Sequence, residues 1–249
     1  MNPNAAHEPI IKIENLYKKY GDNVVLDGFN LNIYQGGNLV IMGKSGSGKS
    51  VMIKCLIGLE IPDSGTIEIM SQKLEHLSLK ALDEIRADIG FLFQGSALYD
   101  SMTVRENLEF PLRRHISKFG NVKDTLPLVE EALQNVGLKN VIDLMPNELS
   151  GGMKRRVALA RTLILKPKII IYDEPTTGLD PITSKEIILL MKSVQEKYKT
   201  SSIIITHDVD CARVIANRMI LLIDGKNYAE GTFAELSTSQ DPKVKAFFK

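Results

Sequence analysis

Short apolar runs alternate with longer stretches of helical periodicity along most of the chain. The runs begin at Ile10, Leu39, Thr66, Ile89, Ile169, Ile203 and Met219. The runs at Ile169 and Ile203 are apolar at successive positions, which is typical of a strand buried on both faces of a parallel sheet. The stretches between the runs predict helices over 50–59, 150–165, 183–198 and 209–215. This alternation predicts an α/β fold whose mainly parallel sheet is covered on both faces.

Two segments depart from the alternation. Residues 95–147 carry few strand signals and much helical periodicity, as in VKDTLPLVEEALQNVGL, so they predict a helical insertion. The segment up to about Ile69 has short strands with the turn signals YGDN and DSG, which predict a small antiparallel layer. The sequence shows no internal repeat or long linker. We therefore expect one domain over 1–249, with a core of 1–94 and 148–249 and the insertion at about 95–147.

Composition narrows the class of protein. The 249 residues are 44% hydrophobic and 24% charged, which is ordinary for a soluble globular protein, and 31 basic and 30 acidic residues leave a net charge of +1. This balance argues against a nucleic-acid partner. No apolar run approaches the roughly 20 residues of a membrane span, and MNPNAAHEP does not resemble a secretory signal. Cys55 and Cys211 are too few for a disulfide framework, so they indicate a reducing compartment and small apolar roles.

A glycine-rich loop carries the first chemical signal. The segment GKSGSGKS matches G-x-x-x-x-G-K-[ST] and lies between the apolar run NLVIM and the predicted helix VMIKCLIGL. Its glycines allow successive N–H groups to surround a phosphate, Lys49 would reach the β- and γ-phosphates, and Ser50 would bind Mg²⁺. The predicted phosphate-binding residues are Gly43, Lys44, Ser45, Gly46, Ser47, Gly48, Lys49 and Ser50.

An acidic pair ends one of the buried runs. In IIIYDE, Asp173 is a candidate Mg²⁺ ligand and Glu174 a candidate general base. Both lie at the carboxyl end of a predicted strand, which is where α/β sheets bind ligands. Alone, such a pair is more often simply solvated, but the phosphate loop earlier in the chain favours catalysis.

The segment LSGGM opens a predicted helix. Ser150 is a plausible N-cap residue, and Gly151 and Gly152 expose N–H groups at the helix N-terminus. By itself this pattern indicates no more than a capped helix. On a chain with a phosphate loop, it predicts a second anion site.

The order of these motifs resembles the nucleotide-binding subunit of ABC transporters. The resemblance covers about residues 10–231 and includes, in order, Tyr20, the phosphate loop, Gln94, LSGGM, IIIYDE, the GLD ending at Asp180, and His207. It implies a P-loop NTPase fold with an N-terminal antiparallel layer and a helical subdomain. It also implies ATP hydrolysis, with ATP and Mg²⁺ bound.

The resemblance gives four further residues a role. It implies that Tyr20 stacks on adenine; Tyr17 is the rival, although Gly21 beside Tyr20 favours Tyr20. Gln94 would touch Mg²⁺ and the attacking water, and His207 would contact the γ-phosphate. Asp180 would reach across a dimer interface to the other subunit.

In this family two cassettes pack head to tail around ATP. The resemblance implies that Ser150, Gly151 and Gly152 of one subunit cover the γ-phosphate held by the phosphate loop of the other. Hydrolysis then removes the phosphate that bridges the homodimer. The chain departs from the family pattern at Met153, where glutamine is usual, so no role is carried over to that position.

A narrower resemblance points to one class of ABC system. The segment GSALYDSMTVRENLEFPLRRH, together with GGM and GLDPI, is similar to the ATPases of bacterial Mla/Mce lipid-trafficking systems, and DPKVKAFFK resembles the end of their core. The resemblance implies an integral membrane permease similar to MlaE, an Mce-domain lipid-binding protein, and a place on the cytoplasmic face of the inner membrane. Some members have a longer tail that contacts the neighbouring cassette; this chain ends at Lys249 without such a tail, so the resemblance does not carry that form of dimer support over to it.

The permease groove is expected within residues 95–114. Tyr99 and Met102 are the expected exposed contacts. The remaining apolar side chains are expected in the core: Leu98, Val104, Leu108 and Phe110. The neighbouring Arg113 and Arg114 are interpreted as a solvated helix end.

Four alternatives remain beside lipid transport. The first is the ATPase of another ABC transporter class with a different substrate. A DNA-repair or chromosome-organising ATPase would have long coiled coils between the phosphate loop and LSGGM, and in this chain that interval is too short and lacks sustained heptads. A translation-associated ABC protein usually has two cassettes, whereas this chain has one. A nucleotide-binding scaffold without turnover is disfavoured by the presence of Glu174 and His207.

Overall fold

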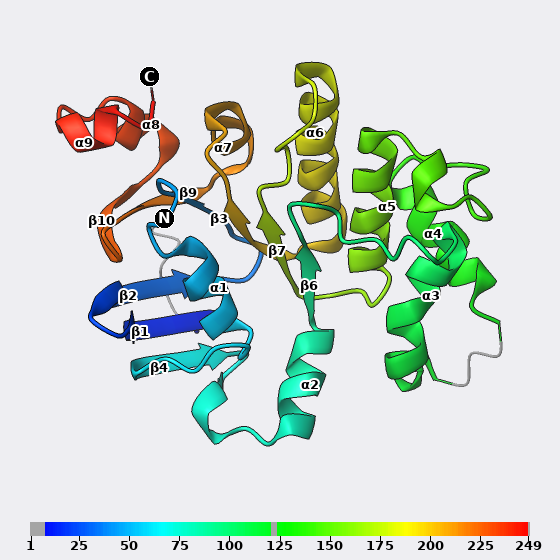
Figure 1. The fold of residues 1–249 in the computed structure, drawn as a ribbon, viewed down its shortest axis with the longest axis horizontal. Helices are drawn as coiled ribbons and strands as arrows, with labels where there is room; N and C mark the ends of the chain where they lie inside the picture. Colours follow the sequence, from blue (N-terminus) through cyan, green and yellow to red (C-terminus); the bar gives the residue numbers. More distant parts are fainter. Residues whose placement is uncertain (1–7, 121–123, 249) are drawn as a thin grey trace. The chain divides into compact units, whose positions relative to one another are not determined.

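The computed structural model describes residues 8–120 and 124–248, and they form two compact units. The first unit contains the described residues 8–86 and 201–248, and the second contains 87–120 and 124–200. The prediction that the N-terminus is not a targeting signal concerns mainly residues 1–7, which lie outside the described part of the chain. Figure 1 colours the elements of both units in chain order.

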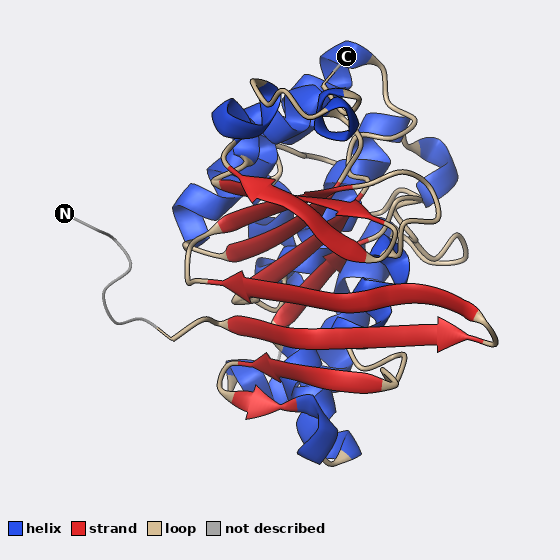
Figure 2. Cartoon of the chain, turned by 90° about the vertical axis from the view of Figure 1, so that its left-hand side faces the viewer, coloured by secondary structure: helices blue, strands red, loops and turns tan. Residues whose placement is uncertain are grey.

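An antiparallel layer forms one part of the first unit. Its strands run in the order β2-β1-β4-β5. Figure 2 shows the strands of the structure in red. They are β1 (Ile11–Tyr20), β2 (Asn23–Ile33), β4 (Ser64–Ile69) and β5 (Gln72–Lys73). The predicted layer is therefore confirmed, but β1 and β2 span 10 and 11 residues rather than being short. Register shifts divide their pairing, which explains why the sequence does not alternate regularly along either strand.

The same unit contains strands in the order β10-β9-β3-β8. They are β3 (Asn38–Met42), β8 (Ser201–Ile205), β9 (Arg218–Ile223) and β10 (Lys226–Gly231). β3 pairs in parallel with β8 and with β9, and every residue of β3 and β8 is buried, as their continuous apolar runs predict. The sequence analysis missed β10, an antiparallel edge strand whose residues are only half-buried or exposed.

Helices flank these strands in the first unit. They are α1 (Lys49–Leu56), α2 (Leu79–Ala87), α7 (Val209–Ile215), α8 (Phe233–Ser237) and α9 (Pro242–Lys245), with a 3₁₀ turn over Leu74–His76. The last residue of α2, Ala87, is assigned to the second unit. The predicted helix over 50–59 ends early, because Gly58 adopts a left-handed φ of 67° just beyond α1. Cys55 and Cys211 are buried, as expected for small apolar residues, and burial raises the pKa of the Cys55 thiol to about 11.

The second unit pairs two parallel strands with four helices. The strands are β6 (Ile89–Leu92) and β7 (Ile169–Asp173); the helices are α3 (Val104–His115), α4 (Leu126–Asn135), α5 (Gly151–Leu163) and α6 (Pro181–Tyr198), with 3₁₀ turns over Ile116–Phe119 and Pro146–Glu148. α3 and α4 confirm the helical character predicted for 95–147, although Val122 and Lys123 of the predicted helix lie outside the described residues.

Helix α5 is the centre of packing in this unit. It contacts α3, α4, α6 and β6, and its inner face buries Val157, Leu159 and Ala160. Helix α6 begins at Pro181, two residues before the predicted start, because Asp180 caps it. Across the described residues, no helix of either unit combines the length and the apolar character needed to cross a bilayer.

Candidate active site

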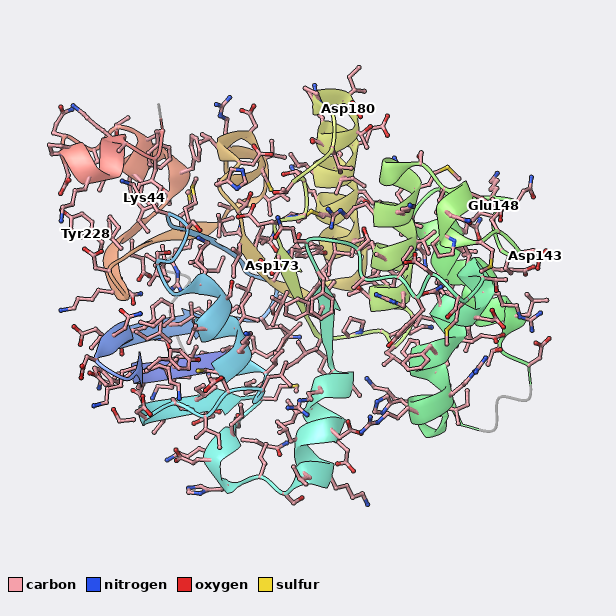
Figure 3. The ribbon with its side chains drawn as sticks, in the orientation of Figure 1. Lys44, Asp143, Glu148, Asp173, Asp180 and Tyr228 are labelled. Carbon is pink, nitrogen blue, oxygen red and sulfur yellow. The ribbon has the colours of Figure 1, made fainter. Side chains whose placement is uncertain are left out.

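The phosphate loop connects β3 to α1 and depends on its glycines. Gly46 and Gly48 have φ of 81° and 106°, values that side chains disfavour. A Cβ on Gly48 would lie 2.6 Å from the carbonyl oxygen of Val25, and one on Gly43 would lie 2.4 Å from Oγ of Ser47. The backbone therefore packs too closely for larger residues, while the exposed Lys44 begins the open part of the loop (Figure 3).

Lys49 folds back over this loop. Its Nζ donates to the carbonyl oxygens of Gly43 at 2.6 Å and Lys44 at 3.0 Å. These bonds place a positive charge inside the turn of backbone that would bind phosphates. Ser50, the next residue of α1, is exposed. The first unit thus brings the loop and its cation together, as the motif predicts.

Tyr20 is the better placed of the two candidate aromatics. It ends β1 with 46% of its surface exposed, whereas Tyr17 is half-buried. Lys18 Nζ lies 5.2 Å from the centroid of the Tyr20 ring. Burial and the nearby Glu60 raise the pKa of the Tyr20 hydroxyl, although Lys18 acts in the opposite direction. An exposed ring held by charged neighbours suits stacking on a base.

His207 lies in the short link between β8 and α7. It is exposed and stands beside Asp208, whose carboxylate accepts the N–H groups of Asp210 and Cys211 as the N-cap of α7. This cap sets the direction in which the chain leaves the strand, and His207 therefore has a defined place at the carboxyl end of β8.

The acidic pair of the second unit lies where β7 ends. Asp173 is the last residue of the strand and is partly buried (Figure 3). Glu174 adopts a left-handed φ of 48°, which is strained for a residue with a side chain. Its carboxylate accepts the hydroxyl of Thr177 at 3.2 Å, and its carbonyl accepts the Thr177 N–H at 3.3 Å. Thr177 therefore fixes both the backbone and the side chain of Glu174.

The LSGGM segment begins α5 as predicted. Ser150 Oγ accepts the N–H of Met153 at 3.2 Å, so Ser150 is the N-cap. Gly151 is exposed, but a Cβ on Gly152 would lie 2.7 Å from Cγ2 of Thr183 in α6. The two glycines thus differ: one faces outward, and the other allows α5 and α6 to pack closely.

Asp180 caps α6 beside this contact. Its carboxylate accepts the N–H groups of Ile182 and Thr183, both at 3.0 Å, and the Thr183 hydroxyl at 2.5 Å. The hydroxyl of Thr183 and then its N–H are the main causes that lower the pKa of Asp180. Thr183 therefore connects Asp180 with Gly152, so two predicted site residues lie at neighbouring helix N-termini. In Figure 3, Asp180 stands at the end of α6.

Gln94 follows β6 and is exposed. The carbonyl of the preceding Phe93 accepts a hydrogen bond from Arg155 of α5 at 2.7 Å. The sequence analysis missed Arg155 and Thr177. The first looks like one of three successive basic residues, and its burial depends on packing that no local pattern reveals.

The candidate metal ligands of the chain are oxygen atoms, and they suit Mg²⁺ better than a metal ion whose ligands all come from protein. No group of three or more His, Cys, Asp or Glu side chains suited to a metal ion occurs among the residues that the structure describes. Mg²⁺ usually takes one or two protein oxygens and completes its shell with water and phosphates. The Ser50 hydroxyl and the Asp173 carboxylate have this chemistry, and they belong to different units.

A known protein family matches the part of the chain that carries these motifs. The family described as ABC transporter matches residues 26–177, which include the phosphate loop, Gln94, LSGGM and the acidic pair. The chain belongs to this family. This cassette therefore binds and hydrolyses ATP, and the predicted P-loop NTPase fold with an antiparallel layer is confirmed.

Individual relatives resemble the cassette over most of its length. It is 40% identical to the intermembrane phospholipid transport system ATP-binding protein MlaF of Haemophilus influenzae, covering 98% of this chain and 91% of the relative. It is 36% identical to the methionine import ATP-binding protein MetN of Campylobacter jejuni, covering 96% of this chain and 75% of the relative. Among solved structures, the ATP-binding cassette MJ0796, a dimer in a post-hydrolysis state bound to ADP and Pi, matches with a TM-score of 0.79 and 36% identity. That match covers 90% of this chain and 98% of MJ0796.

Proposed function

We propose that this ABC transporter ATPase subunit powers phospholipid transport across a bacterial envelope, in a system of the Mla/Mce type. The observation that carries the proposal is its similarity to MlaF, which extends over 91% of that relative. The segment around Tyr99–Met102, which departs from the usual importer pattern, supports the same class. Similarity to MetN favours the alternative, an importer of a small substrate such as an amino acid.

In this proposal the residues predicted from the sequence motifs share the chemistry of one ATP site. The loop from Gly43 to Ser50 binds the phosphates through its N–H groups, with Lys49 neutralising the β- and γ-phosphates. Tyr20 stacks on the adenine. Ser50, Asp173 and Gln94 would hold Mg²⁺ together with the phosphates, and the ion would supply positive charge to the reacting oxygens. Residues 1–94 and 148–249 act together as the nucleotide-binding core of a single domain.

Glu174 is the proposed general base. Its carboxylate accepts a proton from the attacking water, whose oxygen bonds to the γ-phosphorus while the bond to the β–γ bridging oxygen breaks and ADP leaves. Thr177 keeps the carboxylate in one orientation through its 3.2 Å hydrogen bond. Gln94 orients the water, and His207 contacts the γ-phosphate.

A second copy of the chain completes the site. Ser150, Gly151 and Gly152 lie at the N-terminus of α5, where N–H groups and the helix dipole favour an anion. We propose that they cover the γ-phosphate bound by the partner, with Asp180 at the interface between the two copies. The similar MJ0796 cassette, solved as a dimer bound to ADP and Pi, supports this arrangement.

The second unit offers a surface for the permease. A hollow of about 420 Å³ lies beside α3 and α5, and the exposed rings of Phe93, Tyr99 and Phe110 line part of it. The expectation that Phe110 belongs to the core is wrong, because its ring is 44% exposed and lies against Tyr99, with centroids 4.8 Å apart. Met102 is half-buried rather than fully exposed.

This apolar hollow fits a helix of an integral membrane partner. We propose an MlaE-like permease there and, through it, an Mce-domain lipid-binding protein. The cassette would then be a peripheral subunit on the cytoplasmic face of the inner membrane.

Replacing Glu174 by glutamine tests the catalytic part. Glu174→Gln should bind ATP normally, hydrolyse it at least a hundredfold more slowly, and form an ATP-dependent dimer that light scattering detects. The matched control is Glu130→Gln, which changes an exposed carboxylate of α4. Hydrolysis at the wild-type rate by Glu174→Gln would overturn the general-base assignment.

The substrate class needs the assembled transporter. The cassette with its native permease, reconstituted in phospholipid vesicles, should move labelled phospholipid between membranes only with hydrolysable ATP. Methionine serves as the competing substrate. If methionine enters the vesicles and stimulates hydrolysis while labelled lipid does not move, the importer alternative is correct.

A further inference from the structure

Arg155 is a buried cation with unusual surroundings. It lies in the third position after Gly152 in α5 and is only 4% exposed. Among the described residues, no carboxylate forms an ion pair with it and its Nε has no hydrogen-bond partner. Burial accordingly lowers the pKa of its guanidinium. A buried charge without a counter-ion is costly, and apolar replacements of such groups are often neutral or stabilising, so stability alone explains Arg155 poorly.

The two ends of its guanidinium bind two different loops. Nη1 donates to the carbonyl of Phe93 at 2.7 Å, directly before Gln94. Nη2 donates to the carbonyl of Thr177 at 3.2 Å. Because the guanidinium is planar and rigid, these two bonds define the spacing between the loops that follow β6 and β7.

Each loop carries a residue assigned to the attacking water. Thr177 in turn holds the carboxylate and carbonyl of Glu174. A shift of the Thr177 carbonyl would therefore move Glu174, whose left-handed backbone already depends on its surroundings. A shift of Phe93 would likewise move Gln94.

The helix that carries Arg155 also carries the signature residues. Ser150, Gly151 and Gly152 precede it by only one and a half turns of α5. Over so short a stretch of helix, a movement of this N-terminus, such as a second chain contributing ATP would cause, would also move the guanidinium. The adjacent Arg156 makes no such link, since it binds the carbonyl of Val136 and the carboxylate of Glu186.

We propose that Arg155 is a positioning residue for hydrolysis. It holds Gln94 and Glu174 in fixed positions relative to each other and to the N-terminus of α5, which carries the LSGGM residues. This inference rests on the proposed roles of Gln94 and Glu174. One buried side chain would then link two events: binding of the partner's ATP at the N-terminus of α5, and alignment of Gln94 and Glu174 with the attacking water.

Arg155→Gln tests the proposal, with Arg156→Gln as the matched control. Arg155→Gln should lower kcat about tenfold or more and leave KM for ATP within about twofold, because the phosphate loop is untouched. It should still dimerise with a non-hydrolysable ATP analogue. Arg155→Lys, which keeps the charge but not the planar fork, should recover only part of kcat. Arg156→Gln should keep kcat within about twofold of the wild type.

A second measurement separates positioning from misfolding. The double variant Arg155→Gln with Thr177→Val should lose less activity than the product of the two single losses, because both act through Glu174. The hydrolysis rate is divided by the concentration of chains that bind the ATP analogue, so unfolded protein does not lower the measured kcat. The proposal is overturned if kcat per binding-competent chain of Arg155→Gln stays within twofold of wild type, or if Arg156→Gln loses as much. A wild-type rate for Glu174→Gln would instead overturn the function assigned to Glu174 and leave this comparison intact.

Discussion

Gly152 lies so close to Thr183 that no side chain fits between them. A Cβ would stand 2.7 Å from Cγ2 of Thr183, and Thr183 cannot turn away without losing its hydroxyl bond to Asp180. Gly151, one residue earlier, has room, since a Cβ there would meet only Leu179 at 3.8 Å. The two glycines of the signature therefore serve different purposes.

This difference predicts opposite effects of alanine on stability. Gly152→Ala should destabilise the cassette by about 1–3 kcal/mol through overpacking. Gly151→Ala should unfold at the wild-type temperature or slightly higher, because alanine favours a helix by up to about 1 kcal/mol over glycine. Thermal unfolding checks both, and a Gly152→Ala variant as stable as the wild type would contradict the packing argument.

Gly151→Ala should nevertheless reduce ATP hydrolysis. The added methyl group would stand where the backbone of α5 is proposed to approach the partner's γ-phosphate. We expect a several-fold loss of kcat, measured at saturating ATP, in a protein with unchanged stability. Full activity in Gly151→Ala would show that this backbone does not approach the nucleotide closely.

Lys49→Ala should abolish ATP binding or hydrolysis. Its ammonium lies against the carbonyls of Gly43 and Lys44, in the turn that binds phosphate, and alanine cannot neutralise the β- and γ-phosphates. Titration with a fluorescent ATP analogue measures the loss. Lys44→Ala is the control in the same loop, because it keeps the backbone N–H groups; equal losses in both variants would argue against a special role for Lys49.

Tyr20→Ala should weaken ATP binding by roughly three- to tenfold, as expected for the loss of one aromatic stacking partner. Tyr20→Phe should bind almost normally, and inorganic tripolyphosphate, which has no base, should bind both variants like the wild type. Isothermal titration compares these ligands. If Tyr17→Ala loses ATP affinity and Tyr20→Ala does not, the rival assignment is correct.

Asp88 gives the second unit a pH-dependent stability. Burial of this carboxyl acts to raise its pKa, but hydrogen bonds and charge from Lys118 and Lys168 outweigh it, so the pKa lies below its ordinary value. A depressed folded-state pKa contributes stability above the unfolded pKa of about 3.9, and this contribution is lost as the pH falls through the folded value. The contribution should therefore be fully present at neutral pH.

Asp88→Asn tests this expectation by urea unfolding at two pH values. At pH 7 the variant should be less stable by on the order of 1–2 kcal/mol, between the values for exposed and for buried pairs. At pH 3 the difference should shrink, because this pH lies below the unfolded-state pKa of about 3.9, where the contribution of the ionised carboxyl begins to be lost. Lys168→Gln, which removes only the more exposed partner, should cost less. A difference independent of pH would contradict the ionic origin.

Much of the fold follows from local pattern. The continuous apolar runs at Ile169 and Ile203 identify strands buried on both faces, because water must be excluded from each side of β7 and β8. Ser150 predicts the start of α5 because only a short polar side chain satisfies the first N–H groups. By contrast, β10 and the full length of β1 and β2 were missed, since exposed and bulged strands lack a regular period.

The chemistry of this protein follows from motifs in its amino-acid sequence. A phosphate loop, an acidic strand end and a second helix N-terminus indicate an ATP-hydrolysing cassette, because each needs specific residue types at fixed spacing. Which neighbouring residues hold these motifs in place depends on three-dimensional packing. Arg155 looks like one of three solvated cations until packing buries it between two loops, and Phe110 looks like core until α3 turns its ring outward. Local spacing sets which face of a helix a residue occupies, but burial depends on what other elements cover that face.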